Sequence, residues 1–148
     1  MAIWQYKFFV IPKEIFDGVI HKVLFNEFDL FEDDIYWTQF PIKADFFSKI
    51  NNFLPLGKSW TKDLIIYGNL ETNCFEVLCE NDYVISVSFR IDFTSFYEDI
   101  LRLIIEFLEK NNLLIISEEF DIVSNNYIQI KAIIENSIQY LKYNELTD

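Results

Sequence analysis

The clearest alternation of hydrophobic and polar side chains runs from Tyr83 to Asp92. The odd-numbered positions of this stretch are all apolar or aromatic, and the even-numbered positions end in the charged residues Arg90 and Asp92. Successive side chains of a β-strand point to opposite faces of its sheet. The pattern therefore predicts a half-buried strand with one apolar face and an opposite-charge pair, Arg90 and Asp92, on the other face.

Four further stretches are expected to be strands. Residues 63–68 and 73–79 precede the strand 83–92 in the chain. Short spacers with turn residues separate the three stretches, which predicts an antiparallel meander. Residues 3–11 are rich in aromatic and branched side chains and stop before Pro12. Residues 113–117 are apolar without alternation, which is typical of a strand covered on both faces. If strand 113–117 joins the same sheet as strand 83–92, the connection between them is a right-handed crossover and the two strands run parallel.

The clearest helix is predicted for residues 95–110. Ser95 and Glu98 fit a capping box at its start, and the pair Asn111-Asn112 can take the left-handed conformation that ends a helix. Its polar side carries charged residues at four-residue steps, and its apolar stripe is expected to lie on the sheet. The residues of that stripe are Phe96, Ile100, Leu103, Ile104, Phe107 and Leu108.

The last helix is predicted for residues 126–142, with Ser124 or Asn125 as its cap. Its inward face comprises Ile130, Ile133, Ile134, Ser137, Ile138 and Leu141. A helix over residues 44–54 is expected to end at Pro55, because the residue before a proline is driven out of the helical region. A short amphipathic helix is expected over residues 15–24.

Together these elements predict a single α+β domain over residues 1–148. We expect a mostly antiparallel sheet of about five strands, with helices 95–110 and 126–142 packed on its apolar face. The 25–60 region, which has no clean period at its start, is expected to cover an edge or an end of the sheet. A chain of this length buries roughly 70% of the surface that its unfolded form exposes, so one core is sufficient.

The charge of the chain narrows the class of partner. The formal net charge is −12, and residues 61–148 carry 16 acidic against 6 basic side chains. Nucleic acid and anionic membranes are held mainly by Lys and Arg, so neither is an expected partner, whereas a basic protein is. We find no secretory signal and no apolar run near the ~18 residues that a membrane helix needs, which predicts a cytoplasmic protein.

The motifs that mark common catalytic sites are missing from the sequence. His21 is the single histidine, and Gly-rich phosphate loops cannot be built from three scattered glycines. Cys74 and Cys79 lie in one predicted strand, about 16 Å apart along it and on opposite faces, so they cannot form a disulfide with each other. We therefore expect no metal, no cofactor and a function other than catalysis.

An acidic stretch with aromatic residues is the first candidate for a contact surface. It can be a solvated loop pinned to the core by its phenylalanines, or a surface whose aromatic residues anchor a basic partner while its carboxylates steer it. The candidate residues are Glu27, Phe28, Asp29, Phe31, Glu32, Asp33, Asp34 and Trp37. Glu118, Glu119 and Asp121 form a second, smaller acidic cluster. Carboxylate pairs for hydrolysis can be drawn from either cluster, but acidic residues this common pair by chance.

The polar face of the strand 83–92 is the second candidate. Ser86 and Ser88 share that face with Arg90 and Asp92. The charged pair can be an ion pair that closes the sheet, a partner-binding pair that uses the planar guanidinium of arginine, or part of a catalytic or small-ligand site.

Short motifs across the chain resemble those of a family of small, acidic, largely uncharacterised bacterial single-domain proteins. The motifs are Leu54-Pro-Leu-Gly-Lys-Ser-Trp60, Tyr67-Gly68, Asn73, Val77, Arg90-Ile-Asp92, Ser137 and Phe9-Val-Ile-Pro-Lys13. Tyr67 departs from the pattern, which has tryptophan at that place. In size, charge and build the chain is also similar to immunity proteins of bacterial toxin systems. This resemblance implies an immunity protein that binds and neutralises a cationic toxin domain. The first alternative is a small-ligand or enzymatic domain on the strand face of Ser86, Ser88, Arg90 and Asp92, and the second is a structural or regulatory module within a larger assembly.

Overall fold

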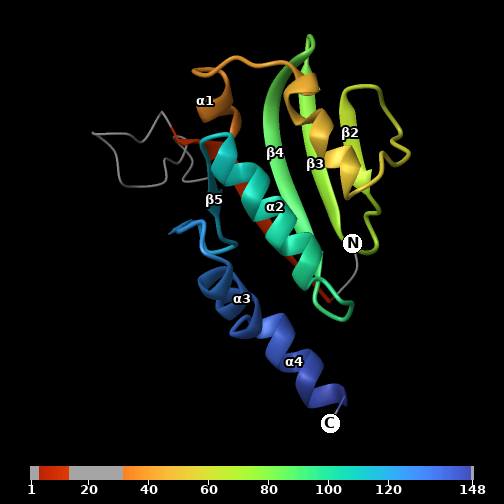
Figure 1. Cartoon of the computed structure of the whole chain (residues 1–148), viewed down its shortest axis with the longest axis vertical. Coiled ribbons are helices and arrows are strands. Elements are labelled where there is room, and N and C mark those ends of the chain that lie inside the picture. The colour runs from red at the N-terminus through yellow and green to blue at the C-terminus, as the bar shows by residue number, and fades with distance from the viewer. Residues whose placement is uncertain (1–3, 14–31, 148) are drawn as a thin grey trace.

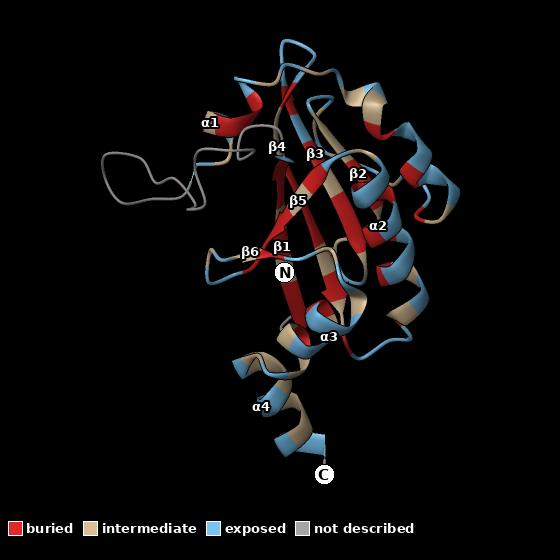
Figure 2. Ribbon diagram, turned by 60° about the vertical axis from the view of Figure 1, so that its left-hand side comes forward, coloured by how far each residue is buried: buried red, intermediate tan, exposed pale blue. Residues whose placement is uncertain are grey.

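A computed structural model of the chain describes residues 4–13 and 32–147. They form a six-stranded sheet in the order β2-β3-β4-β1-β5-β6, in which every neighbouring pair is antiparallel (Figures 1 and 2). The strands are β1 (Gln5–Pro12), β2 (Leu64–Gly68), β3 (Cys74–Glu80), β4 (Tyr83–Asp92), β5 (Leu113–Ile116) and β6 (Ile122–Val123). The helices are α1 (Asp34–Trp37), the 3₁₀-helix η2 (Ala44–Asn52), α2 (Glu98–Lys110), α3 (Tyr127–Glu135) and α4 (Ile138–Thr147).

The predicted α+β class, with a single domain and an antiparallel sheet, is confirmed. The sixth strand, β6, is two residues long and forms a hairpin with β5. At the opposite edge, the backbone N–H of Gly57 donates to the carbonyl of Ile66 at 2.7 Å, and Leu56 bridges to Tyr67. Part of the 25–60 region thus covers the β2 edge, as expected.

The N-terminal strand β1 lies in the middle of the sheet. It pairs with β4 on one side, where Phe8 faces Phe89, and with β5 on the other, where Val10 faces Ile115. β4 and β5 therefore run parallel, as predicted, but β1 separates them. The sequence predicts the direction of a strand after a crossover helix, whereas an inserted strand from the other end of the chain leaves no local signal.

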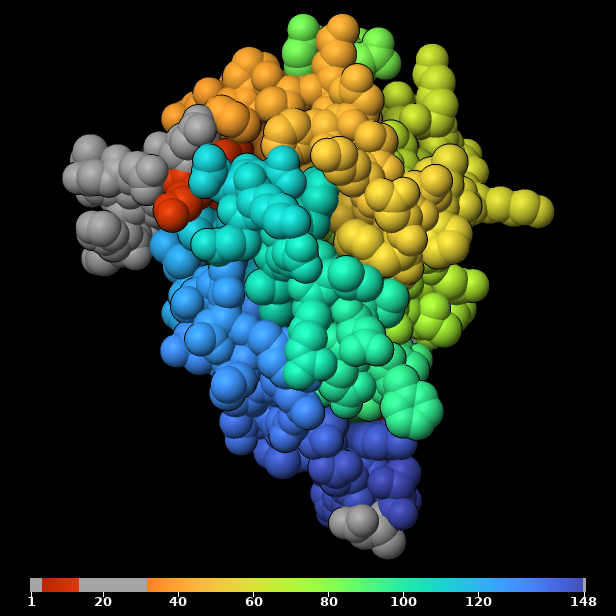
Figure 3. All heavy atoms as spheres, viewed as in Figure 1, coloured from red at the N-terminus to blue at the C-terminus, as the bar shows by residue number. Residues whose placement is uncertain are grey.

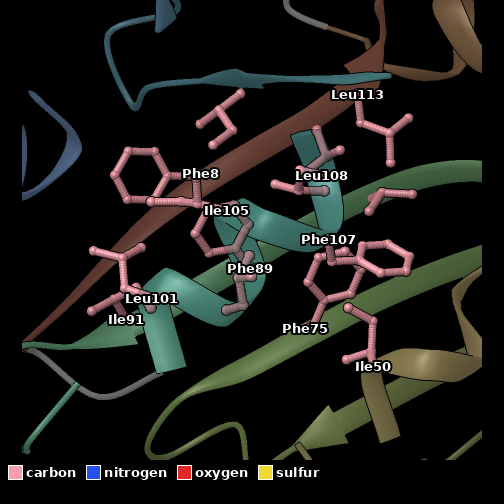
Figure 4. Packing of buried hydrophobic residues seen from close by; sticks show 14 of the residues in the cluster. Phe8, Ile50, Phe75, Phe89, Ile91, Leu101, Ile105, Phe107, Leu108 and Leu113 are labelled. Carbon is pink, nitrogen blue, oxygen red and sulfur yellow. The ribbon is translucent and has the colours of Figure 1, made fainter. Parts of the chain in front are cut away.

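The core lies between one face of the sheet and α2, with α3 and η2 beside it (Figures 1 and 2). Phe89 is at its centre and stacks on Phe8 and Phe75, with ring centroids at 5.0 and 6.2 Å. From α2, Leu101, Ile105, Phe107 and Leu108 point toward these rings (Figure 4).

A bulge in β4 corrects the predicted alternation of that strand. Leu78 pairs with Ser86 but the next residue, Cys79, pairs with Val84, so Ile85 is an extra residue on β4. Side chains on the two sides of a bulge are therefore out of phase. As a result Val84 is buried, and Tyr83, predicted to face the core, is 47% exposed.

The start and the face of α2 also differ from the prediction. The helix begins at Glu98, and the hydroxyl of Ser95 donates to the carbonyl of Asp92 at 2.7 Å instead of capping the helix. Phe96 therefore lies before the first turn and is 97% exposed. On the helix itself Leu101 is fully buried, whereas Leu103, predicted to face inward, is 39% exposed. At the other end, Asn112 has a φ of 55°, so the predicted left-handed stop is confirmed.

The last predicted helix is broken into α3 and α4 between Asn136 and Ser137. Asn126, rather than Ser124 or Asn125, caps α3 by accepting from the backbone N–H of Gln129 at 3.2 Å. The break changes the direction of the chain. Tyr140 and Tyr143 of α4 pack against the core, whereas Ile138 and Leu141, predicted to face inward, are exposed. α4 extends from the lower end of the molecule (Figures 1 and 3).

Candidate functional site

The acidic stretch predicted as a contact surface is described in part, because Glu27, Phe28, Asp29 and Phe31 lie outside the described residues. Glu32 and Asp34 are exposed at the start of α1. Asp33 is half-buried, and its carboxylate accepts a hydrogen bond from the hydroxyl of Ser86 at 2.5 Å. Asp33 therefore ties α1 to the polar face of β4.

Trp37 is not at the surface, which corrects its assignment as an anchor for a partner. Its ring is fully buried, and its indole N–H donates to the carbonyl of Val10 at 3.1 Å. It also meets the ring of Phe47 edge to face, with centroids 6.0 Å apart. A tryptophan near several carboxylates resembles an interface anchor in sequence, but here its indole holds α1 against β1.

Burial raises the pKa of Asp33, and the hydrogen bond from Ser86 opposes this effect only in part. A carboxyl whose pKa is higher in the folded state stabilises the fold below its unfolded pKa and loses that stabilisation as pH rises through the folded pKa. Asp33→Asn should therefore increase stability at pH 7, and the gain should disappear as pH falls below about 4. Urea unfolding at both pH values measures this, with exposed Asp34→Asn as the control. A less stable Asp33→Asn protein at pH 7 would show that the bond between the carboxylate and Ser86 outweighs the burial.

The polar face of β4 carries an ion pair, but the acidic member is not the predicted one. Arg90 pairs with Glu76 of β3 at 3.2 Å, and both side chains are about 15% exposed. The carboxylate of Asp92 instead accepts from the backbone N–H and the hydroxyl of Thr94, at 2.9 and 2.6 Å. Spacing within one strand cannot predict a partner on the neighbouring strand, and Glu76 is such a partner.

The two cysteines lie on opposite faces of β3, as predicted. Cys74 faces Arg90 across the strands, whereas Cys79 belongs to the core cluster. Both thiols are free and buried. Burial raises the pKa of Cys74 to about 11, so its thiol is protonated near neutral pH and is a poor nucleophile.

A groove of about 670 Å³ separates the turn after β5 from α3 and α4. One wall is acidic, because Glu118, Glu119 and Asp121 all line it and are all exposed. The other wall comes from the two helices and mixes amide, hydroxyl and apolar side chains. The lining residues are Tyr6, Ser117, Glu118, Glu119, Asp121, Ile122, Val123, Ser124, Gln129, Ala132, Ile133, Asn136, Ser137, Ile138 and Gln139.

Glu118 fixes the acidic wall to the sheet. Its carboxylate accepts from the backbone N–H of Lys7 at 2.9 Å and from the side-chain amide of Gln139 at 2.9 Å. Its own backbone N–H donates to the hydroxyl of Tyr6 at 3.1 Å. Strand β5 pairs with β1 only from Phe9 onward, so these side chains occupy the edge of β1 that β5 leaves open. The wall is therefore built on the sheet itself.

The turn that carries the acids is held in a fixed shape. The backbone N–H of Phe120 donates to the carbonyl of Ser117 at 2.9 Å, and Phe120 has a φ of 64°, which is rare for an aromatic residue. Its ring stacks on that of Phe9, with ring centroids 5.9 Å apart. This contact holds the turn against the face of β1 that lies opposite the main core. Glu119 and Asp121 flank this anchor and point their charge to solvent.

Among the described residues, those that line the groove include no lysine, arginine, histidine or cysteine. Lys131, on α3, is engaged with Glu135 at 3.7 Å. Within residues 4–13 and 32–147, no three of His, Cys, Asp and Glu come together as a metal site would require. The same residues contain no helix long and apolar enough to span a bilayer. The groove is thus a negatively charged surface to which the described part of the chain contributes no counter-charge.

The sequence identified the acidic half of this groove but not the groove. Glu118, Glu119 and Asp121 stand together in the chain, so their clustering was visible as composition. The wall opposite them exists because α3 ends at Glu135 and α4 leaves in a new direction, and a continuous helical pattern over 126–142 predicted no such break.

No protein-family model matches this chain, and no curated protein or solved structure matches it either. The family resemblance of the short motifs therefore stays a prediction, and the roles of the residues rest on the geometry of the groove.

Proposed function

We propose that this chain is a non-enzymatic binding protein whose partner is a basic protein, most concretely an immunity protein that blocks a cationic toxin domain. The observation that carries the proposal is the acidic groove, in which Glu118, Glu119 and Asp121 face solvent and no basic side chain of residues 4–13 or 32–147 lines the wall. The formal charge of −12 acts in the same direction, because a strong net field attracts an oppositely charged partner from a distance.

Contact suits the groove better than catalysis. Nucleophilic mechanisms need a nucleophile within hydrogen-bond reach of a base, and the lining residues that the structure describes include neither histidine nor cysteine nor lysine. The carboxylate of Glu118 is already engaged by the backbone of Lys7 and by Gln139. Glu118 therefore acts as a support for the wall, which leaves Glu119 and Asp121 to meet a partner.

The polar face of β4 is the alternative site, and its side chains serve contacts inside the fold. Arg90 pairs with Glu76, Ser86 donates to Asp33, and the carboxylate of Asp92 accepts from Thr94. These contacts favour a structural role for the face over a small-ligand or enzymatic one.

Charge reversal in the groove tests the proposal. Glu119→Lys/Asp121→Lys is compared with Glu71→Lys/Glu80→Lys, which changes the net charge equally at exposed positions outside the groove. Each protein is immobilised and exposed to a lysate of the native host at about 0.05 M and about 0.5 M salt. The wild type and the control should retain a basic protein at low salt, and the groove variant should bind it at least tenfold more weakly, about 1.4 kcal/mol.

Titration calorimetry with the purified retained protein gives the affinities. Equal binding by wild type and groove variant, or retention that does not respond to salt, would contradict a partner held by the acidic groove.

A further inference from the structure

The apolar half of the groove continues onto a helix that has no buried side chain. Every described side chain of α4 is at least partly exposed, and Ile138, which lines the groove, is 83% exposed (Figure 2). Leu141 is 56% exposed and lies three residues further on, so it shares a helix face with Ile138. Ile133 of α3 lines the same wall. An apolar strip therefore runs from the groove onto α4, opposite the acidic turn.

From this arrangement we infer that the groove and the adjoining face of α4 bind a basic amphipathic segment of a protein partner. Apolar side chains of the segment would pack on Ile133, Ile138 and Leu141. Its lysine or arginine side chains would meet Glu119 and Asp121 across the groove. The inference rests on the proposed function and adds the chemistry of the partner's contact segment.

Charge and shape select this occupant over others. An anionic lipid surface would bring negative charge toward the exposed carboxylates of the groove, which opposes binding. A second copy of this chain carries the same charge of −12, so its approach is disfavoured as well. A purely basic segment would leave Ile138 and Leu141 in water. A segment with one basic and one apolar side satisfies both walls, as amphipathic segments do in other grooves.

The two walls should have separable effects on the kinetics of binding. Exposed charges mainly set the association rate and its salt dependence, whereas close apolar packing mainly sets the dissociation rate. Removal of the apolar strip should therefore speed dissociation at unchanged association. Reversal of the acids should slow association and reduce its salt dependence.

The experiment uses the full chain and a short amidated peptide of leucine and lysine at helical spacing, with a scrambled peptide of equal charge as its control. The variant Ile138→Ser/Leu141→Ser removes the apolar strip without removing a buried side chain. Ile128→Ser is the matched control, because Ile128 is 76% exposed on α3 but does not line the groove. Surface plasmon resonance should show about tenfold faster dissociation for the double variant, no change for Ile128→Ser, and weaker binding of the scrambled peptide. Circular dichroism melting checks that all variants fold alike.

Other outcomes overturn the inference in distinguishable ways. If Glu119→Lys/Asp121→Lys weakens binding but Ile138→Ser/Leu141→Ser does not, the amphipathic partner is wrong and the basic partner stands. If neither variant changes the binding of the peptide, the groove is not the binding site and both proposals are wrong about it. Self-association of the wild type that Ile138→Ser/Leu141→Ser abolishes would assign the strip to a second copy. Binding to phosphatidylglycerol vesicles through the strip would assign it to lipid.

Discussion

Phe89→Ala is expected to lower the free energy of unfolding by about 3–5 kcal/mol, as removal of a fully buried phenylalanine does elsewhere. Phe89 is 0% exposed and lies at the middle of the sheet, between the rings of Phe8 and Phe75 (Figure 4). α2 covers the same rings, so the surrounding side chains are tied to both layers and cannot collapse into the cavity. Urea unfolding followed by circular dichroism measures the loss.

Phe96→Ala is the matched control for this prediction. Phe96 is also a phenylalanine near α2, and its helical spacing placed it on the inward stripe, but it is 97% exposed. Its removal should change stability by no more than about 0.5 kcal/mol. If Phe89→Ala and Phe96→Ala lowered the free energy of unfolding by similar amounts, Phe96 would be buried as its spacing predicts. The packing of α2 on the sheet through Leu101 would then be wrong.

The second large effect is expected at the ion pair of Arg90 and Glu76. Both side chains are about 15% exposed, and the Nε of Arg90 has no hydrogen-bond partner among the described residues. Glu76→Ala would leave the guanidinium largely buried without its counter-charge, which should cost about 3 kcal/mol. Arg90→Ala should cost a similar amount because it leaves the carboxylate of Glu76 unpaired.

A double-mutant cycle separates the pair from its surroundings. Glu76→Ala/Arg90→Ala should cost less than the sum of the single variants, with a coupling of about 1–3 kcal/mol. Glu80→Ala, at an exposed position of the same strand, should be nearly neutral. If Glu76→Ala and Arg90→Ala changed stability as little as Glu80→Ala, the ion pair would be solvated. A partner-binding role for Arg90 would then be favoured over a structural one.

The short length of β5 determines where the groove forms. β1 pairs with β5 only over Phe9 to Pro12, so the edge of β1 near Gln5 and Lys7 is completed by side chains from the turn and from α4. A side chain that completes a strand edge must approach closely, which brings Glu118 and Gln139 together at 2.9 Å. The walls of the groove are thus positioned by backbone hydrogen bonds of the sheet.

Five of the six strands and the fold class follow from local patterns in the sequence, because alternation with a period of two is a local property of a half-buried strand. The two-residue strand β6 was not predicted. The sequence also determined the sign of the field, since net charge does not depend on the fold, and the left-handed stop at Asn112. It identified Glu118, Glu119 and Asp121 as an acidic cluster, and it excluded the common catalytic motifs.

Which side chains face each other depends on packing between distant segments and does not follow from local patterns. The insertion of β1 between β4 and β5, the pairing of Arg90 with Glu76 and the burial of Trp37 all join residues distant in the chain. The break between α3 and α4 turned Ile138 outward and made the second wall of the groove. Local spacing records the preference of each segment for helix or strand, whereas packing between segments selects the face that is buried.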